Sequence, residues 1–598
     1  MRLINVKAFI EREGSIRKRK RGDRPAKVLE FCDDEATEYA ILSHRWMAEE
    51  VDYDEMVGLA NIALGERDEI RRRDGYRKIL QSCEQAQKDG YEWLWVDTCC
   101  IDKRSSAELS EAINSMYRWY ENAKVCYAYL HDVPDPQFPI ASDEERYPDF
   151  RGWPEWFSRG WTLQELIAPS NVQFFNKGWQ IIGDKRTLAP TLEAITRIQE
   201  RILTEGLHGN RPCVAQIMSW AAHRKTTRVE DRAYSLMGLL DVNMPMLYGE
   251  GKKAFRRLQL EIIRASNDQS IFAWECCGRT GSILADDPSC FQYCGKMELM
   301  GHELVEYFRQ DVPEEELHSL EDRLGTFPIT NRGIQIWLLL RPLRDSRTFF
   351  QAQLPCCDSL GDPVTIDLAL WESNYYRCSP PSFGSFPEGP QLRQVYLRYQ
   401  DLPYGNTTFE VDDSTLTENG FTCCDTYPKK FSGTTLTLTG TDPLCVKVYF
   451  DSQANHRFSV GFGHCFGKGW ISVGSVESDI IQPPPWGDYT SDEYREILYD
   501  TPVHAEAMNK MRSGSEGYHD QIYVMQVRFP QTTGVLQISS AMWNSSRMCR
   551  VKLGVFHDPG FCDESGEWTA FDVDVGTFFA FLIGTDITIY LGNRRSRF

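Results

Sequence analysis

Between about residues 39 and 175, the hydrophobic pattern alternates between short apolar runs and helical periods. Residues 39–42 and 93–96 are apolar runs of strand length, and the second is almost wholly apolar, as in strands buried on both faces. Two later segments have apolar residues at helical spacing, and two further strand-like runs follow. The helical positions are Tyr76, Ile79, Leu80, Cys83 and Ala86, then Leu109, Ile113, Met116, Tyr117 and Tyr120; the later runs are residues 125–130 and 172–175. This alternation predicts a parallel sheet covered by helices, with ligands beyond the carboxyl ends of the strands.

The pattern changes twice further along the chain. Residues 176–275 have mainly helical periods, which predicts a helical extension to the α/β core. After about residue 290, short β-rich runs separated by breakers dominate, from residues 333–340 to residues 587–591. We therefore predict an N-terminal domain over 1–290, with its core at about 1–180 and its extension at about 181–275. A β-rich, antiparallel and sandwich-like region follows over 291–598.

One short helix, ahead of the strand at 172–175, presents a carboxylate. At 100° per residue Trp161 and Glu165 share one face, while Leu163 and Ile167 lie nearly opposite and anchor the helix to a core. A carboxylate beside an aromatic ring and away from the buried stripe suits catalysis or binding. An acidic residue on a solvated helix face has the same spacing, so the pattern by itself leaves both interpretations open.

Composition narrows the class of protein. The chain has 598 residues, a net charge of −20 and no apolar stretch long enough to span a membrane. The acidic balance argues against a nucleic-acid partner, although the basic run 17–21 is either a targeting or anionic-surface patch or a solvated loop. The 19 cysteines include no CxxC pair, so neither a metal site nor a disulfide framework is indicated. With no signal-peptide pattern at the start, we expect a cytoplasmic protein.

Several sequence blocks in the N-terminal half carry a resemblance to a known family. They are Tyr-Ala-Ile-Leu-Ser-His-Arg-Trp at 39–46, Trp-Val-Asp-Thr-Cys-Cys-Ile-Asp-Lys at 95–103, the segment 106–116, Ser-Arg-Gly-Trp-Thr-Leu-Gln-Glu-Leu at 158–166, and Glu-Asp-Arg-Ala-Tyr-Ser-Leu-Met-Gly at 230–238. In this order they resemble the fungal heterokaryon-incompatibility (HET) domain over roughly residues 1–275. The resemblance implies a role in non-self recognition and programmed cell death after cell fusion, a form of innate immunity.

A weaker resemblance concerns the chemistry. The order of strand, Ser-His-Arg, helix, strand, helix, strand and Trp-Thr-Leu-Gln-Glu-Leu is similar to Toll/interleukin-receptor (TIR) domains, which implies a TIR-like, flavodoxin-type sheet. Many plant members have Trp-Cys-Leu-x-Glu-Leu at the matching point, where the Glu is catalytic in NAD cleavage. Glu165 matches that residue, whereas Thr162 departs from the Cys.

The resemblance implies NAD or NADP as a substrate and no bound cofactor. A carboxylate at Glu165 would stabilise the oxocarbenium-like sugar formed when nicotinamide leaves. Arg45, at the end of the first strand, suits a pyrophosphate, and Ser43 and His44 suit ribose hydroxyls. The expected pocket also includes three further residues, Trp46, Asp97 and Trp161.

Structural roles remain open for the same residues. His44 is also consistent with a packed histidine bonded to a backbone carbonyl. Arg45 is also consistent with a structural pair to Asp97 or Asp102, and Asp97 either caps the next turn or lines the site.

The sequence thus leads to one function and two rivals. The first is a cell-death effector that cleaves NAD as an activated homo-oligomer, since TIR-like sites are often completed by a neighbouring protomer. The second is a non-enzymatic module that recruits a death effector through the same surfaces. In the third, the C-terminal half binds a ligand or partner protein and restrains the HET domain.

Overall fold

A computed structural model describes the fold. It describes residues 1–17, 27–59, 64–207, 209, 211–275, 281–300, 320–342, 349–371, 373–378, 390–400, 407–418, 420–427, 433–438, 444–451, 456–465, 468–475, 521–528, 533–543, 548–557 and 571–574. The basic run 17–21, apart from Arg17, and the strand predicted at 587–591 lie outside these residues. The chain divides into two compact units, one of residues 1–275, 284–338 and 353–366 and one of residues 276–283, 339–352 and 367–598. The boundary expected after residue 290 stays a prediction.

The N-terminal unit is built on a seven-stranded sheet in the order β2-β1-β4-β3-β5-β6-β7. Its strands are β1 (Arg2–Asn5), β2 (Leu29–Phe31), β3 (Ala40–His44), β4 (Trp93–Trp95), β5 (Val125–Tyr129), β6 (Val172–Phe175) and β7 (Ile181–Asp184). The four predicted strands form its parallel centre, β4-β3-β5-β6, whereas β1, β2 and β7 pair antiparallel. The sheet is therefore mixed. The pattern missed β7, which lies in the segment predicted to be mainly helical and returns by a short connection that permits only antiparallel pairing.

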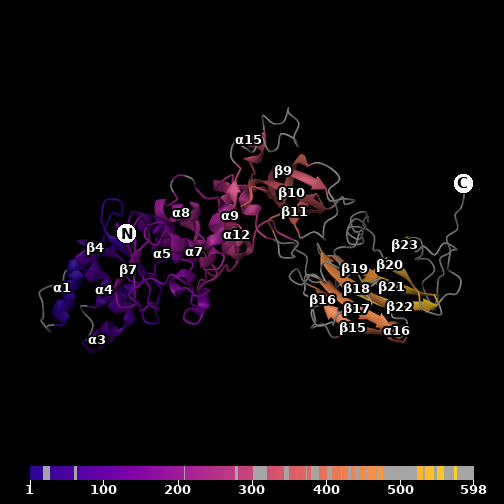
Figure 1. The fold of residues 1–598 in the computed structure, drawn as a ribbon, viewed down its shortest axis with the longest axis horizontal. Coiled ribbons are helices and arrows are strands. Elements are labelled where there is room, and N and C mark those ends of the chain that lie inside the picture. Colours follow the sequence, from indigo (N-terminus) through magenta and orange to yellow (C-terminus); the bar gives the residue numbers. More distant parts are fainter. Residues whose placement is uncertain are drawn as a thin grey trace. The chain divides into compact units, whose positions relative to one another are not determined.

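Helices accompany this sheet. They are α1 (Val6–Arg17), α2 (Tyr53–Gly58), α3 (Leu64–Arg72), α4 (Asp74–Lys88), α5 (Ser106–Asn122) and α6 (Thr162–Ile167). In Figure 1, α1 lies to one side of β4 and β7, and α5 lies to the other. The predicted apolar stripe of α4 is buried except for Leu80, and that of α5 is buried except for Leu109 and Tyr117. Ser105 caps α5 by accepting from the Glu108 amide, while the Glu108 carboxylate binds the Asp102 amide at 2.9 Å rather than closing a capping box.

The predicted helical extension follows β7. Its elements are α7 (Ala189–Thr196), α8 (Glu200–Glu205), α9 (Val214–Ala221), α10 (Asp231–Tyr234), α11 (Met237–Leu240) and α12 (Lys253–Ala265). Apolar residues at 233, 236, 237 and 240 have the spacing of one helix, but the chain turns at Ser235 and Leu236 and forms two short helices. Short 3₁₀ helices complete the unit: η1 (Pro148–Phe150), η2 (Glu155–Ser158), η3 (Gln269–Phe272) and η4 (Pro288–Phe291).

Gly238 marks the contact between α11 and α5, and we expect Gly238→Ala to destabilise the protein by about 1–3 kcal/mol. A Cβ atom there would lie 2.2 Å from Cβ of Tyr117, a rigid atom that cannot move aside. The matched control is Gly14→Ala in α1, where nothing lies within 4 Å of the added atom. That variant should gain about 0.5–1 kcal/mol from helix propensity. Urea unfolding of both variants checks this, and equal stability would contradict the close approach.

The chain after residue 290 is β-rich, as predicted. One six-stranded sheet has the order β11-β12-β13-β9-β10-β8. Its strands are β8 (Glu298–Leu299), β9 (Ile334–Pro342), β10 (Phe349–Cys357), β11 (Pro363–Trp371), β12 (Asn374–Arg377) and β13 (Gln391–Leu397), and α15 (Leu320–Leu324) precedes β9. Most strand pairs are antiparallel, but β12–β13 is parallel.

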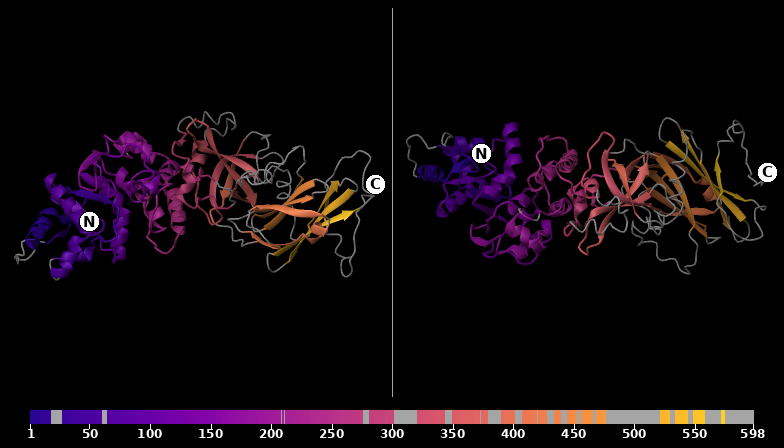
Figure 2. Two further views of the ribbon diagram at one scale, coloured as in Figure 1. Left: turned by 60° about the horizontal axis from the view of Figure 1, so that its bottom comes forward. Right: turned by 90° about the horizontal axis from the view of Figure 1, so that it is seen from above.

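Two further sheets belong to the second compact unit, with orders β16-β14-β22-β21-β20-β23 and β15-β17-β18-β19. Their strands, the orange and yellow arrows of Figure 2, are β14 (Thr407–Asp412), β15 (Phe421–Tyr427), β16 (Thr435–Leu438), β17 (Leu444–Asp451), β18 (His456–Cys465), β19 (Lys468–Ser475), β20 (Gln521–Arg528), β21 (Thr533–Trp543), β22 (Met548–His557) and β23 (Phe571–Asp574), with helix α16 (Ser414–Glu418). Phe409 and Phe462, both fully buried, join the two sheets with ring centroids 5.5 Å apart. The pair β14–β22 is parallel, an exception to the predicted antiparallel pattern.

No helix in the described part of the chain is both long enough and apolar enough to cross a membrane.

Candidate functional site

Helix α6, which carries Glu165, is enclosed on every side. All six of its residues are buried, and Glu165 is only 7% exposed. The helix packs against β3, α5, α8 and η2, which leaves a six-residue helix no face for solvent. The prediction that Glu165 lies away from the buried stripe is therefore wrong, and the solvated-face interpretation is wrong with it.

The Glu165 carboxyl is held by a directed pair of hydrogen bonds. The indole Nε1 of Trp156, on η2, donates to Ser43 Oγ at 2.9 Å. Because an indole N–H only donates, the Ser43 oxygen accepts there and keeps its own hydrogen for a second bond. That hydrogen is donated to Glu165 Oε2 in a short contact. Ser43, at the carboxyl end of β3, thus fixes a carboxyl group 122 residues away in the sequence.

Burial dominates the ionisation of Glu165. It raises the pKa of this carboxyl to about 8, with a further contribution from the negative charge of Asp97. The hydrogen bonds from Ser43 and Tyr120 favour the carboxylate and oppose this shift, but they do not outweigh it. The unliganded protein therefore holds Glu165 mostly protonated at neutral pH.

A second group of polar side chains lies beside the first. His44 Nε2 is 3.6 Å from Asp97 Oδ1, and Trp46 Nε1 donates to Asp97 Oδ2 at 2.6 Å. The ammonium of Lys103 lies 3.9 Å from the centroid of the half-exposed Trp46 ring. Asp97 thus contacts both His44 and Trp46, and its role in a site stays a prediction. Burial raises the pKa of Asp97.

His44 is buried and has no hydrogen-bond partner among the described residues, so the carbonyl bond considered for it is not found there. Burial and nearby lysines hold the pKa of His44 well below its usual value, so the ring is neutral at physiological pH.

Arg45 forms an ion pair with a residue that the sequence did not identify as its partner. Its guanidinium pairs with Glu155 at 2.7 Å, and neither Asp97 nor Asp102 is its ion-pair partner. Glu155 also lies 3.7 Å from His131, which follows the end of β5. Parallel strands end at a common edge, so residues 130–132 after the predicted strand were the signal that could have found His131. No such signal marked Glu155, because its 3₁₀ helix reaches this edge only in the folded chain.

Trp161 belongs elsewhere. Trp161 and the Tyr248 hydroxyl both donate hydrogen bonds to the Asp231 carboxyl, and the bond from Tyr248 is 3.0 Å long. The structure thus places Ser43 against Glu165 and gathers His44 and Trp46 around Asp97, but it gives Trp161 a partner in α10. The face shared by Trp161 and Glu165 on a helical wheel does not make them partners in one site.

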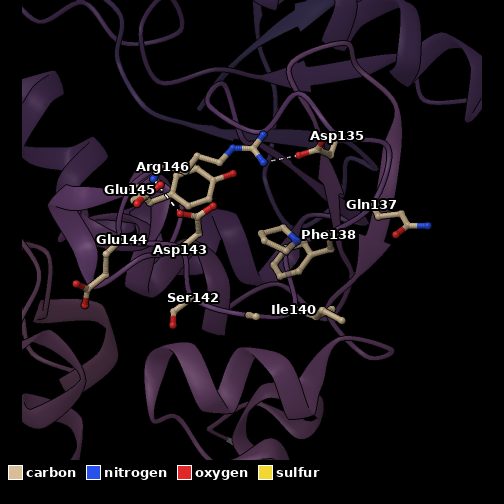
Figure 3. Close-up of a pocket in the computed structure, with 12 residues that line it drawn as sticks. Asp135, Gln137, Phe138, Ile140, Ser142, Asp143, Glu144, Glu145 and Arg146 are labelled. Atoms are coloured by element: carbon tan, nitrogen blue, oxygen red, sulfur yellow. Dashed lines mark hydrogen bonds and ion pairs between the residues drawn. The ribbon is translucent and has the colours of Figure 1, made fainter.

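A cavity of about 610 Å³ elsewhere in the N-terminal unit does not involve these residues. It is lined by the loop 135–147, where Arg146 binds Asp135 at 2.6 Å and the Glu144 side chain points away from this pair (Figure 3). None of the residues predicted for the site lines it. Its open form and exposed Ile140 set it apart from the buried Glu165.

Metal and thiol chemistry find no support in this neighbourhood. Within the described ranges, no cluster of His, Cys, Asp and Glu has the makings of a metal site. Cys99 and Cys126 are fully buried, and burial raises the pKa of each thiol well above its usual value. Neither is therefore activated as a nucleophile.

Comparisons with known proteins bear on this half of the chain. The family model described as heterokaryon incompatibility protein (HET) matches residues 39–149, and a domain of unknown function, DUF8212, matches residues 253–290. The vegetative incompatibility protein HET-E-1 of Podospora anserina is 44% identical over 230 residues, which cover 38% of this chain and 16% of that protein. The chain thus spans about a sixth of that relative's length. No solved structure matches this chain. Residues 39–149, which include Ser43 but not Glu165, thus match the heterokaryon incompatibility (HET) family, and 230 residues of the chain are similar to a vegetative incompatibility protein.

Proposed function

We propose that the protein acts in heterokaryon incompatibility as an effector of programmed cell death, and that its HET domain cleaves NAD with Glu165 as the key carboxylate. The name and identity of the vegetative incompatibility relative support the biological role. The chemical role rests on one observation. Glu165 is a buried carboxyl whose pKa is raised to about 8 and whose orientation is fixed by Ser43 and Trp156.

The position of the site in the sheet supports this proposal. Numbered by chain order, the central parallel strands β3, β4, β5 and β6 lie in the spatial order 2-1-3-4. In open sheets of this kind, ligands bind beyond the carboxyl ends of the strands where the order reverses. Here that point lies between β3 and β5, whose ends carry Ser43 to Arg45 and His131.

The required chemistry is compatible with one carboxyl group. Cleavage of the ribosyl–nicotinamide bond releases neutral nicotinamide from a pyridinium and leaves positive charge on the ribose ring. A carboxylate beside the anomeric carbon stabilises that charge, and the cationic pyridinium favours ionisation of Glu165 on binding. Arg45 would exchange Glu155 for the pyrophosphate, while His44, Trp46 and Asp97 would contact the remainder of NAD or NADP.

We expect Glu165→Gln to lower nicotinamide release from NAD by at least about a hundredfold, the usual scale for loss of one electrostatic group at a reacting centre. The assay uses the intact chain at high concentration, because activity in an assembled homo-oligomer is part of the proposal. Glu111→Gln, an exposed change on α5, is the matched control and should keep full activity.

The pH profile adds a second readout. Because the pKa of Glu165 is about 8, kcat/KM of the wild type should rise about tenfold per pH unit below that value and level off above it. Release that is equal in wild type and Glu165→Gln would contradict catalysis by this carboxyl. No release from folded, assembled wild type would contradict NAD cleavage altogether.

The burial of Glu165 favours a second candidate function. A carboxyl that is 7% exposed and bonded to core residues also suits a module that signals by assembly, without turnover. On that view Glu165→Gln keeps full cell-killing activity. A light-scattering mass that stays monomeric at every concentration, in a protein that still kills cells, would contradict assembly.

The C-terminal region is proposed as a sensor that binds a ligand or partner protein and restrains the HET domain. Removing residues 401–598 tests this, because it leaves β8 to β13 in place. Killing that is no greater than in the intact chain would contradict restraint.

A further inference from the structure

A small cavity of about 100 Å³ lies at the ends of η1, α7 and α9 in the N-terminal unit. It is separate from the cavity lined by the loop 135–147, and its lining is strongly basic. Three arginines and one histidine line it, namely Arg151, Arg197, Arg224 and His223, and no Asp or Glu is among its described lining residues. Such a set offers hydrogen-bond donors and positive charge without a counter-ion.

Arg224 is the buried part of this set. It is 2% exposed, and its guanidinium donates to the carbonyl oxygen of Arg159 at 2.8 Å and to Thr162 Oγ1 at 2.9 Å. Both acceptors are neutral, and Arg224 forms no ion pair with a described carboxylate. Burial lowers its pKa to about 9, and the one carboxyl that counteracts this, Glu165, is mostly protonated at neutral pH. A buried charge is normally paired, so this guanidinium points to an anion that completes its surroundings.

Arg151 and Arg197 are exposed, at the outer part of the cavity. Arg151 Nη2 lies 2.9 Å from His223 Nε2, and neither arginine is ion-paired with a described carboxylate. Burial lowers the pKa of His223, and the charges of Arg151, Arg197 and Arg232 lower it further, although Asp287 neutralises Arg232. Both Arg151 and Arg197 have left-handed backbone, with φ of 51° and 62°, a conformation that costs energy in any residue but glycine.

A neutral donor completes the lining. Trp220 is 4% exposed, and its Nε1 has no hydrogen-bond partner among the described residues. An unpaired buried N–H is costly, so a ligand oxygen at this place would relieve it. The cavity is thus lined by guanidinium groups and a histidine, whose N–H donors match the oxygens of a phosphate group, and by an indole ring whose N–H is unpaired among the described residues.

A purely structural explanation covers only part of the set. Arg197 caps the C-terminus of α7, and His223 follows the last turn of α9, where cations are favourable. That explanation does not extend to Arg224, which is buried against α6, or to the unpaired N–H of Trp220.

We propose that this cavity is a binding site for a phosphate group, supplied by inorganic phosphate or by the terminal phosphate of a nucleotide. A volume of about 100 Å³ suits the phosphate group itself rather than a whole nucleotide. The half-exposed Trp153 at the rim is available to contact the remainder of a nucleotide.

The test is titration of the intact protein with inorganic phosphate, adenosine monophosphate and adenosine, followed by phosphorus NMR and calorimetry. Arg151→Gln and Arg197→Gln, both at exposed side chains, should each weaken phosphate binding by about tenfold, the scale of one charge-assisted contact. Arg201→Gln on α8 removes the same charge from an exposed residue outside the cavity and should bind like wild type.

The three titrations distinguish between the two sources of the phosphate group. If the protein binds both phosphate and adenosine monophosphate, inorganic phosphate is sufficient as the ligand. If it binds adenosine monophosphate but neither phosphate nor adenosine, the site requires the phosphate of a nucleotide. The proposal is overturned if folded wild type binds neither phosphate compound, or if binding is the same in Arg151→Gln, Arg197→Gln and Arg201→Gln. In the latter case the arginines serve only the ends of the helices.

Discussion

Glu165→Gln should make the protein more stable than wild type at alkaline pH, by as much as about 5 kcal/mol in the free energy of unfolding. The pKa of this carboxyl is about 8 in the folded chain, against an ordinary value of 4.5. Between these two values the folded state binds more protons than the unfolded state, so stability falls as pH rises. The loss of stability caused by burying the ionised carboxylate is absent below about pH 4.5 and complete above about pH 8. Gln keeps the size and the bond to Ser43 but has no charge to bury.

Urea unfolding of both proteins at a series of pH values between about 5 and 8.5 measures this difference. Other groups that titrate in the same range are common to both chains and cancel in the comparison. Glu111→Gln is the control and should follow the wild-type curve at every pH. Parallel curves for wild type and Glu165→Gln would mean that the carboxyl is already ionised in the native protein, and the account of its burial would be wrong.

Lys185→Met should destabilise the protein by about 2–4 kcal/mol. Lys185 follows β7 and is 3% exposed, and its ammonium donates to the carbonyls of Leu166 and Ile167 at 3.2 and 3.4 Å. A third, shorter bond goes to the carbonyl of Pro169, so all three ammonium hydrogens are used. These oxygens lie at and beyond the end of α6, where a helix has no donors of its own. Met fills a similar volume but leaves the three buried acceptors without a donor.

The matched control for Lys185 is Lys177→Met, which removes an exposed ammonium near β7 and should change stability by less than about 0.5 kcal/mol. Urea unfolding at neutral pH, where Lys185 with its pKa lowered to about 8 is still largely charged, gives the comparison. Hydrogen exchange of the α6 amides should speed up in Lys185→Met alone. If the two variants are equally stable, the buried ammonium contributes no net stabilisation, and removal of its desolvation cost offsets the lost bonds.

The neighbourhood of Glu165 illustrates which parts of a site are visible in a sequence. Ser43 and Asp97 were found because each lies at the end of an apolar run, and parallel strands end at one edge of the sheet. The partner of Arg45 was not found, because the choice between Asp97, Asp102 and Glu155 depends on side-chain reach in the folded chain. Trp161 was misplaced for a related reason, since helical spacing fixes direction but not the neighbour that lies there.

Local sequence patterns were enough to predict the parallel centre of the sheet, the helices α4 and α5 and the β-rich character of the second half. They also predicted the sheet edge where Ser43, His44 and Asp97 lie. These follow from local periodicity, and every residue needed for them lies within a short window of the chain. Three features could be seen only in the folded chain: Glu165 is buried, Trp156 directs the Ser43 hydroxyl toward it, and Lys185 binds the carbonyls at the end of its helix. The physical reason is that burial is imposed by elements far apart in the sequence, and desolvation by those elements, more than the residue type, sets the charge of a carboxyl.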